Sequence, residues 1–151
     1  MKLAEALILR ADLRKRTELL RERLRRNAKV QEGEFPIEPP EDLLLELDQV
    51  ATDLELVIRR VNWTNANLMF DPNHRISDAL AMRDTLDLRI RTLRSLVDEL
   101  SRREPWLPRY VTSLDPAALQ KELDDLRLKR REIDTRLQAI NWQEDLLEPN
   151  Y

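Results

Sequence analysis

Cysteine is absent from this 151-residue sequence, and glycine and histidine occur only once each. Without cysteine the chain forms no disulfide and offers no thiolate to a metal ion. A single glycine leaves no glycine-rich phosphate-binding loop. With His74 as the one histidine, the chain lacks both the Glu-x-x-His pairs of dimetal helical proteins and the partners of a nucleophilic triad. We therefore expect no metal, no cofactor and no catalytic activity.

Long apolar runs are also missing, since no stretch approaches the ~20 residues that a membrane-spanning helix needs. The net charge of −3 gives no general attraction to nucleic acid or to an anionic membrane. Residues 1–9 contain one lysine and an apolar run that Glu5 interrupts, which is unlike a secretion signal. We expect a cytoplasmic protein without nucleic-acid or membrane partners.

Charged residues make up 36% of the chain, and leucine, arginine and glutamate are abundant, as in long helices and coiled coils. The sequence predicts an all-α fold, an elongated antiparallel four-helix bundle with coiled-coil-like packing. One helical domain spans residues 1–151, with a first hairpin at about 3–69 and a second at about 77–148. The four helices are expected to run from Leu3 to Lys29, from Glu41, from Ser77 or Asp78, and from Pro116 to Leu147.

Apolar residues at three- and four-residue spacings predict which face of each helix enters the core. Helix ends are signalled by Gly33 after the first helix, by Pro105 after the third, and by Asp115 as the N-cap of the fourth. The predicted core stripes are Leu3, Ala6, Leu13, Leu20 and Leu24; Leu44, Leu47, Ala51, Leu54, Ile58, Val61 and Leu68; Leu86, Ile90, Leu93, Val97 and Leu100; and Leu119, Leu123, Leu126, Ile133, Leu137, Ile140 and Leu147.

Charge reverses sign between the first two predicted helices. Residues 10–29 carry nine basic and three acidic side chains, whereas residues 31–56 carry nine acidic and no basic ones. In an antiparallel hairpin these blocks lie side by side, so they favour one orientation of the two helices. This pairing also argues against the basic block acting as a nucleic-acid-binding arm.

The two halves of the chain contain hints of an internal repeat. Residues 12–17 resemble residues 87–92 at an offset of 75, and residues 44–68 resemble residues 123–147 at an offset of 79. Leucine-rich helices also align with one another by composition alone, so both interpretations stay open.

Several polar residues interrupt the apolar stripes, namely Arg10, Thr17, Asn65, Arg130 and Glu144. Buried and unpaired they would cost several kcal/mol each, so we expect them to pair, to reach solvent or to face a ligand. The first interpretation is that they set the helix register. The alternative is a small polar pocket formed by Arg10, Asn62, Asn65 and Asp84.

Four aromatic residues are candidates for subunit contacts. Trp63 and Trp142 lie off the main stripes near helix ends, while Trp106 and Tyr110 lie in the long connection before the last helix. Trp and Tyr are common interface anchors. The alternative for all four is that the rings cover a helix end or a loop. We favour subunit contact for Trp63 and Trp142, and cover of the bundle end for Trp106 and Tyr110. Helices of about 25 residues are roughly 40 Å long, which leaves apolar surface for a second copy. We expect a homo-oligomer, a dimer or larger.

Five segments together resemble a family of small uncharacterised helical proteins from bacteria, some of which are labelled septicolysin-like. They are residues 4–16 (AEALILRADLRKR), 27–34 (NAKVQEGE), 62–66 (NWTNA), 78–84 (DALAMRD) and 118–142 (ALQKELDD to INW). The resemblance implies an all-helical, oligomeric protein without an established activity, and the label implies a pore-forming cytolysin.

The sequence therefore predicts an oligomeric helical module with a structural or interaction role and no catalysis. One alternative is a small-molecule-binding protein or enzyme that uses the polar pocket. A second alternative is the pore-forming cytolysin that the family label suggests.

Overall fold

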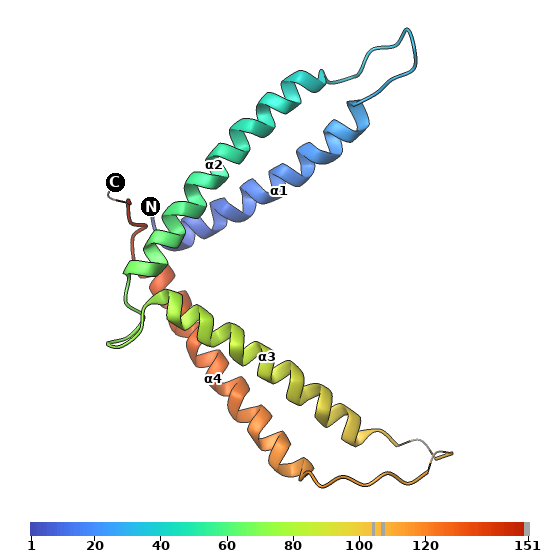
Figure 1. Ribbon diagram of the computed structural model, residues 1–151. Coiled ribbons are helices and arrows are strands. Elements are labelled where there is room, and N and C mark those ends of the chain that lie inside the picture. The colour runs from blue at the N-terminus through green and yellow to red at the C-terminus, as the bar shows by residue number, and fades with distance from the viewer. Residues whose placement is uncertain (104, 107, 150–151) are drawn as a thin grey trace. The chain divides into compact units, whose positions relative to one another are not determined.

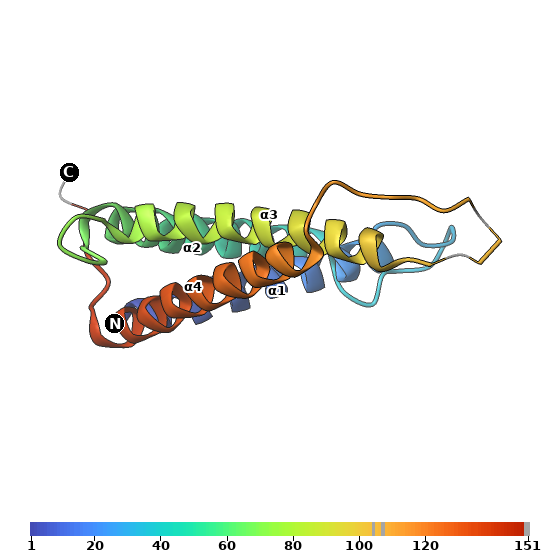
Figure 2. The same ribbon diagram turned by 90° about the horizontal axis from the view of Figure 1, so that it is seen from below.

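The computed structural model describes residues 1–103, 105–106 and 108–149, which contain four long α-helices (Figure 1). These helices are α1 (Leu3–Asn27), α2 (Pro40–Asn67), α3 (Ile76–Ser101) and α4 (Pro116–Gln143). Helix α1 packs against α2, and α3 runs beside α4 (Figures 1 and 2). The predicted all-α fold of two antiparallel helical hairpins is confirmed. We call α1 with α2 hairpin 1, and α3 with α4 hairpin 2.

The chain divides into two compact units. The first contains Met1–Asn67 together with the segment that begins at Asn141, and the second contains Leu68–Ile140. The segment after α4 thus belongs to the unit of hairpin 1, although its Leu147 was expected to continue the stripe of the last helix. The single domain expected from the chain length stays a prediction.

Local chemistry explains most of the helix ends. The Asp115 carboxylate accepts a hydrogen bond from the backbone N–H of Ala117 (3.0 Å), so the predicted N-cap of α4 is confirmed. Helix α1 ends at Asn27, two residues before the predicted end. Gly33 has a φ of +90° and lies in the following loop, so its prediction as a helix cap was wrong. Its left-handed backbone serves the turn between α1 and α2.

The core of hairpin 1 differs from the expected one on α2. Leu43, Val50, Val57 and Val61 are buried, whereas the predicted core residue Leu44 is 51% exposed. Ala51 is also exposed, and Leu47, Leu54 and Ile58 are only half-buried. Helix α2 has two adjoining apolar stripes, and α1 covers the one that contains Leu43, Val50 and Val57. The predicted stripe of α2 is therefore wrong as a core, apart from Val61.

The other helices bury the faces predicted for them more closely. The buried residues on the predicted stripes are Leu3, Ala6, Leu13 and Leu20 on α1, Leu86 on α3, and Leu123, Leu126, Ile133 and Leu137 on α4. Ile90, Leu93, Val97 and Leu100 on α3 are half-buried. Because α4 ends at Gln143, Leu147 does not lie on its stripe.

The two hairpins repeat the same construction, in a register different from the predicted one. At the offset of 75, buried Leu13 corresponds to Leu88, which is 59% exposed, so that alignment was wrong. An offset of 73 for α1 and α3 and of 76 for α2 and α4 matches buried residues with buried residues at six positions along the helices. The matched buried pairs are Leu3 and Ile76, Ala6 and Ala79, Leu13 and Leu86, Val50 and Leu126, Val57 and Ile133, and Val61 and Leu137.

Backbone hydrogen bonds follow the same two offsets. Both second helices contain 28 residues and begin at a proline, Pro40 and Pro116. Both first helices begin with a backbone N–H that donates to a carboxylate three residues later, Lys2 to Glu5 and Arg75 to Asp78. The chain after each second helix then pairs with the start of a first helix. We call each of these pairings a joint. In the first joint, the N–H of Ile76 donates to the carbonyl of Leu68 and the N–H of Phe70 to the carbonyl of His74. In the second joint, the N–H of Leu3 donates to the carbonyl of Glu144 and the N–H of Leu146 to the carbonyl of Met1.

Candidate interaction surface

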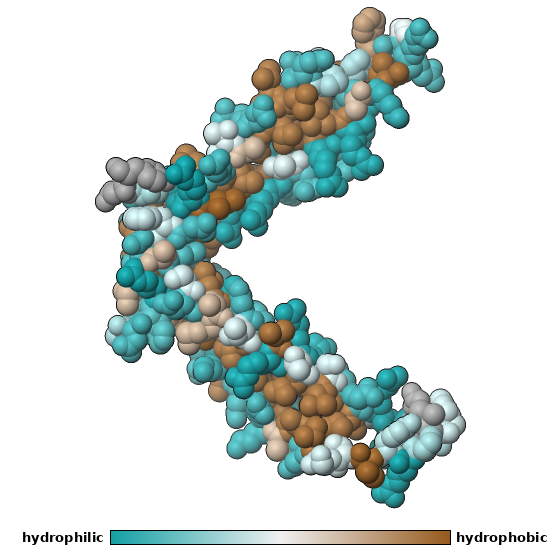
Figure 3. All heavy atoms as spheres, viewed as in Figure 1, coloured by the Kyte–Doolittle hydropathy of each residue, from teal (hydrophilic) through white to brown (hydrophobic). Residues whose placement is uncertain are grey.

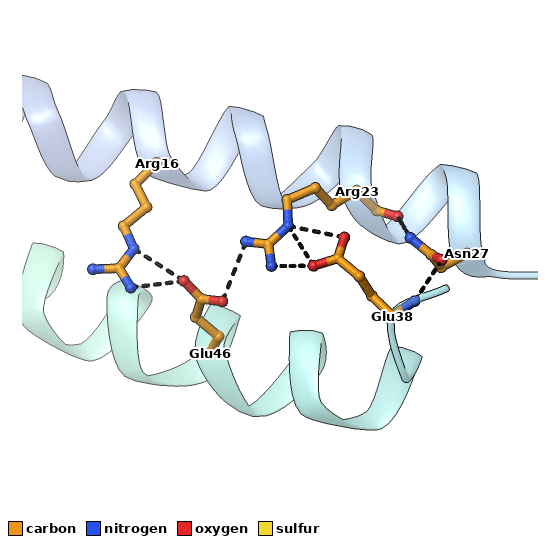
Figure 4. A network of polar contacts seen from close by, with 5 residues as sticks. All are labelled: Arg16, Arg23, Asn27, Glu38 and Glu46. Atoms are coloured by element: carbon orange, nitrogen blue, oxygen red, sulfur yellow. Dashed lines mark hydrogen bonds and ion pairs between the residues drawn. The ribbon is translucent and has the colours of Figure 1, made fainter. Parts of the chain in front are cut away.

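One side of hairpin 1 is closed by ion pairs between the two charge blocks (Figure 4). Arg16 on α1 contacts Glu46 on α2 at 2.6 Å, and Arg23 also reaches Glu46 at 3.3 Å. Arg23 forms a fork with Glu38 in the connecting loop, with its Nε 3.1 Å from Oε1. The predicted juxtaposition of basic and acidic blocks is confirmed, and we call this the charged side of hairpin 1.

The same network holds the connecting loop in place. Buried Asn27 donates through Nδ2 to the backbone carbonyl of Arg23 (2.9 Å) and accepts through Oδ1 from the backbone N–H of Glu38 (3.0 Å). The hydrogen bond from Arg23 lowers the pKa of Glu38, and that from Arg16 lowers the pKa of Glu46. The loop nevertheless leaves Phe35 and Ile37 91% and 97% exposed.

The opposite side of hairpin 1 is apolar. Successive residues of an α-helix are rotated by about 100°. The partly exposed apolar residues of α2 therefore form one stripe along the helix, on the side away from Glu46. We call this set the apolar side, and it consists of Leu44, Leu47, Ala51, Leu54 and Ile58. Figure 3 shows apolar residues gathered on the face of hairpin 1 that is turned to the viewer. No helix of hairpin 1 covers this side, since two helices bury only the faces between them.

Basic residues of α1 border the apolar side. Viewed along the axis of α1, Arg10 and Arg14 lie on one side of the buried Leu13, and Arg16 lies on the other. Arg10 and Arg14 therefore adjoin the apolar side. Arg10 is half-buried, and its pKa is lowered by burial and by the neighbouring positive charge of Arg14. Neither arginine has an ion-pair partner among the residues that the structure describes. This edge therefore carries positive charge that the rest of hairpin 1 does not neutralise.

Acidic residues border the apolar side along its other edge. Asp48 and Glu55 are exposed and lie one helical turn after Leu44 and Ala51. Glu55 has a long contact of 3.8 Å with Arg59 on its own helix, while Asp48 has no ion-pair partner within the described part of the chain. The surface thus has a basic edge, an apolar centre and an acidic edge.

Hairpin 2 has a polar network at the positions that correspond to this surface. Arg130 contacts Asp87 at 2.6 Å and also pairs with Asp134 on its own helix. Arg83 lies 3.7 Å from Asp134, and the hydrogen bond from Arg130 lowers the pKa of Asp87. The expected pairing of the stripe residue Arg130 is confirmed.

The repeat makes the contrast between the hairpins specific. By the offsets of 73 and 76, Arg83 and Asp87 correspond to Arg10 and Arg14, whereas Arg130 and Asp134 correspond to Leu54 and Ile58. On this side of hairpin 2, Arg83 and Arg130 form ion pairs with Asp87 and Asp134. In hairpin 1 the second helix offers leucine and isoleucine there instead, and the arginines stay unpaired.

The four residues of the predicted polar pocket lie on three helices. Arg10 on α1 and Asn65 on α2 are half-buried, and Asn62 on α2 is exposed. Asp84 is exposed on α3, in the second unit, and contacts its neighbour Arg83 at 3.3 Å. Ligand binding by these residues stays a prediction.

The four candidate interface aromatics are all exposed. Trp63 and Trp142 are 40% and 56% exposed, and Trp106 and Tyr110 are about twice as accessible as Trp63, at 80% and 79%. The alternative in which Trp106 and Tyr110 cover a helix end is therefore wrong, because such cover would bury the rings. Their role in subunit contact stays a prediction.

The part of the chain that the structure describes contains no group of three or more His, Asp or Glu side chains placed to hold a metal ion. Within the same residues, no helix combines the length and the apolar character that crossing a membrane requires.

The spacing of the apolar residues identifies this stripe in the sequence but predicts it as core, and no sequence pattern predicted the charged edges. Both apolar stripes of α2 repeat every seven residues, with Leu43, Val50 and Val57 in the core and Leu44, Ala51 and Ile58 at the surface, so the spacing alone does not distinguish them. No sequence pattern indicates the partner of Leu147, whose backbone N–H donates to the hydroxyl of the buried Thr64.

Comparison with known proteins agrees with the fold and names no activity. Residues 10–146 match the model of a family described as "Family of unknown function (DUF6847)". A search of the curated proteins gives no match. The chain is similar to a functionally unknown conserved protein from Corynebacterium diphtheriae whose crystal structure is known. The two are 34% identical over 97% of this chain and 99% of that one, with a TM-score of 0.93.

Neither match is described as a cytolysin, so the resemblance to an uncharacterised helical family is confirmed without the septicolysin label. The chain belongs to the family of unknown function DUF6847.

Proposed function

We propose that this protein is a non-catalytic helical interaction module that works in the cytoplasm as a homo-oligomer, a dimer or larger. The observation that supports the proposal is the apolar side of hairpin 1. It runs along α2 from Leu44 to Ile58 and remains partly in water. Nucleic acid and membranes are not among its partners in this proposal.

The physical reason is the cost of hydrating this stripe. Complete burial of a leucine or isoleucine side chain is worth about 1.5–3 kcal/mol, so burying the rest of a half-exposed one is worth about 1 kcal/mol. Dimerisation through the same side covers the stripe on both copies at once. The gain competes with the several kcal/mol that association costs, so the dimer is concentration-dependent.

Two adjacent leucines provide the test. Leu44 lies on the apolar side, whereas Leu45 is 68% exposed and points away from it, about 100° further around α2. We expect the wild type to dimerise with rising concentration in sedimentation-velocity experiments. Leu44→Glu should remain monomeric at the concentration where the matched control Leu45→Glu still dimerises.

Both substitutions replace an exposed leucine by glutamate, so both variants should keep the helical circular dichroism of the wild type. A wild type that stays monomeric up to the highest soluble concentration contradicts the proposal. So does a Leu45→Glu variant that loses dimerisation while Leu44→Glu retains it.

A further inference from the structure

The surface of hairpin 1 has the charge arrangement of a self-complementary interface. Its basic edge is formed by Arg10 and Arg14 on α1, its centre by the apolar side, and its acidic edge by Asp48 and Glu55 on α2. A surface that carries opposite charges on its two edges fits a second copy of itself when the edges are exchanged.

The ion pair between Arg16 and Glu46 shows which residues of α1 and α2 lie at the same height along the hairpin. The helices are antiparallel and rise equally per residue, so a step toward the start of α1 corresponds to a step toward the end of α2. Arg14 therefore lies level with residue 48. Arg10 lies level with residue 52, within one helical turn of Glu55.

Only one kind of twofold axis brings opposite charges together across a face-to-face contact. An axis in the interface and parallel to the helices places the basic edge of each copy against the acidic edge of the other, at an unchanged level. An axis in the interface and perpendicular to the helices places basic edge against basic edge, which like-charge repulsion disfavours.

We propose that two copies of this chain associate through hairpin 1 about a twofold axis parallel to α2, with Arg14 and Arg10 of each copy opposite Asp48 and Glu55 of the other. This inference rests on the proposed function and specifies its interface. It also gives Arg10 a partner, because a half-buried guanidinium without a carboxylate in its own hairpin gains one on association.

The test uses two single charge reversals at exposed positions that take part in no ion pair of the described chain. In a symmetric dimer, Arg14→Glu places a glutamate opposite Asp48 of the other copy, and Asp48→Arg places an arginine opposite Arg14 of the other copy, so each reversal replaces attraction by repulsion. By symmetry each reversal occurs twice in a homodimer, so each variant alone should dimerise roughly tenfold more weakly than the wild type. An equimolar mixture of the two variants should form a heterodimer of about wild-type affinity.

The measurement is energy transfer between copies labelled with different fluorophores, with each chain used at full length. Lys15→Glu is the matched control for Arg14→Glu, because Lys15 is the exposed neighbour that points to the back of the hairpin. It should dimerise within about twofold of the wild type.

The outcomes separate this inference from the proposed function. Weak self-association of both variants together with recovery in the mixture supports the inference. If Leu44→Glu abolishes dimerisation while both charge variants dimerise like the wild type, or if mixing restores nothing, the inference is overturned and the proposed function stands. A monomeric wild type overturns both.

Discussion

The hydroxyl of Thr64 connects α2 to the segment after α4, and its removal should destabilise the first unit. Thr64 is completely buried. Its Oγ1 donates to the backbone carbonyl of Arg60 (2.8 Å) and accepts from the backbone N–H of Leu147 (2.9 Å). We expect Thr64→Val, which preserves shape and branching, to leave the N–H of Leu147 without its partner.

The magnitude follows from which bonds are lost. The carbonyl of Arg60 keeps its partner within the helix, so losing the threonine donor costs little. The N–H of Leu147 loses its acceptor in a partly buried position, and a buried donor without an acceptor costs about 1–3 kcal/mol. We therefore expect the free energy of unfolding to fall by about 2 kcal/mol.

Thr52 offers a matched control. Its hydroxyl also donates to the carbonyl four residues earlier, that of Asp48 (2.9 Å), but its side chain is exposed. Thr52→Val makes the same change in helix propensity, so we expect it to alter stability by less than about 0.5 kcal/mol. Urea unfolding followed by circular dichroism measures both variants, and hydrogen exchange at the Leu147 amide should accelerate only in Thr64→Val.

Thr64→Ser retains the hydroxyl and should recover much of the lost stability. The reasoning is refuted if Thr64→Val costs no more than Thr52→Val, because the effect would then belong to the local helix and not to the joint. It is also refuted if exchange at Leu147 is unchanged.

Two further predictions concern the repeat and the charged side. The backbone pairing between Met1 and Leu146 is the same as the pairing in the turn before α3. A circular permutant that joins the chain ends through a short flexible linker and opens between Asn73 and His74 should therefore fold with unchanged helical circular dichroism. A permutant without cooperative unfolding contradicts the equivalence of the two joints. Arg16 lowers the pKa of Glu46, so the ion pair stabilises above the unfolded-state pKa and its contribution is lost as the pH falls through the lowered folded-state value. Glu46→Gln should flatten the decline of the urea midpoint between about pH 5 and pH 2, and an unaltered decline would refute this assignment.

Much of the two hairpins was predictable because its signals are local or electrostatic. Proline at residue 40, the acidic first turn of α2 and the Asp115 cap act within a few residues, so they mark helix ends without knowledge of the partner helix. The charge blocks act between neighbouring helices, and only the antiparallel arrangement brings Arg16 and Arg23 to Glu46.

The candidate surface was less accessible to sequence reasoning. Leu44, Leu47, Leu54 and Ile58 form a regular apolar stripe, which by itself indicates burial without saying what covers it. Asp48 and Glu55 look like ordinary solvated charges until the position of the stripe is known. The sequence therefore supplied the residues of the surface, and their arrangement into a basic edge, an apolar centre and an acidic edge came from the fold.

By itself the sequence determined that the chain forms four long helices in two hairpins, and that the first hairpin closes with opposite charges together. Only the tertiary structure decided which stripe of α2 enters the core, which register relates the two hairpins, and that the segment after α4 joins the first unit. The physical reason is the range of the interactions. Helix formation and capping depend on residues a few positions apart, whereas the choice between two apolar stripes depends on which fits the facing helix, and the pairing of Leu146 with Met1 joins opposite ends of the chain.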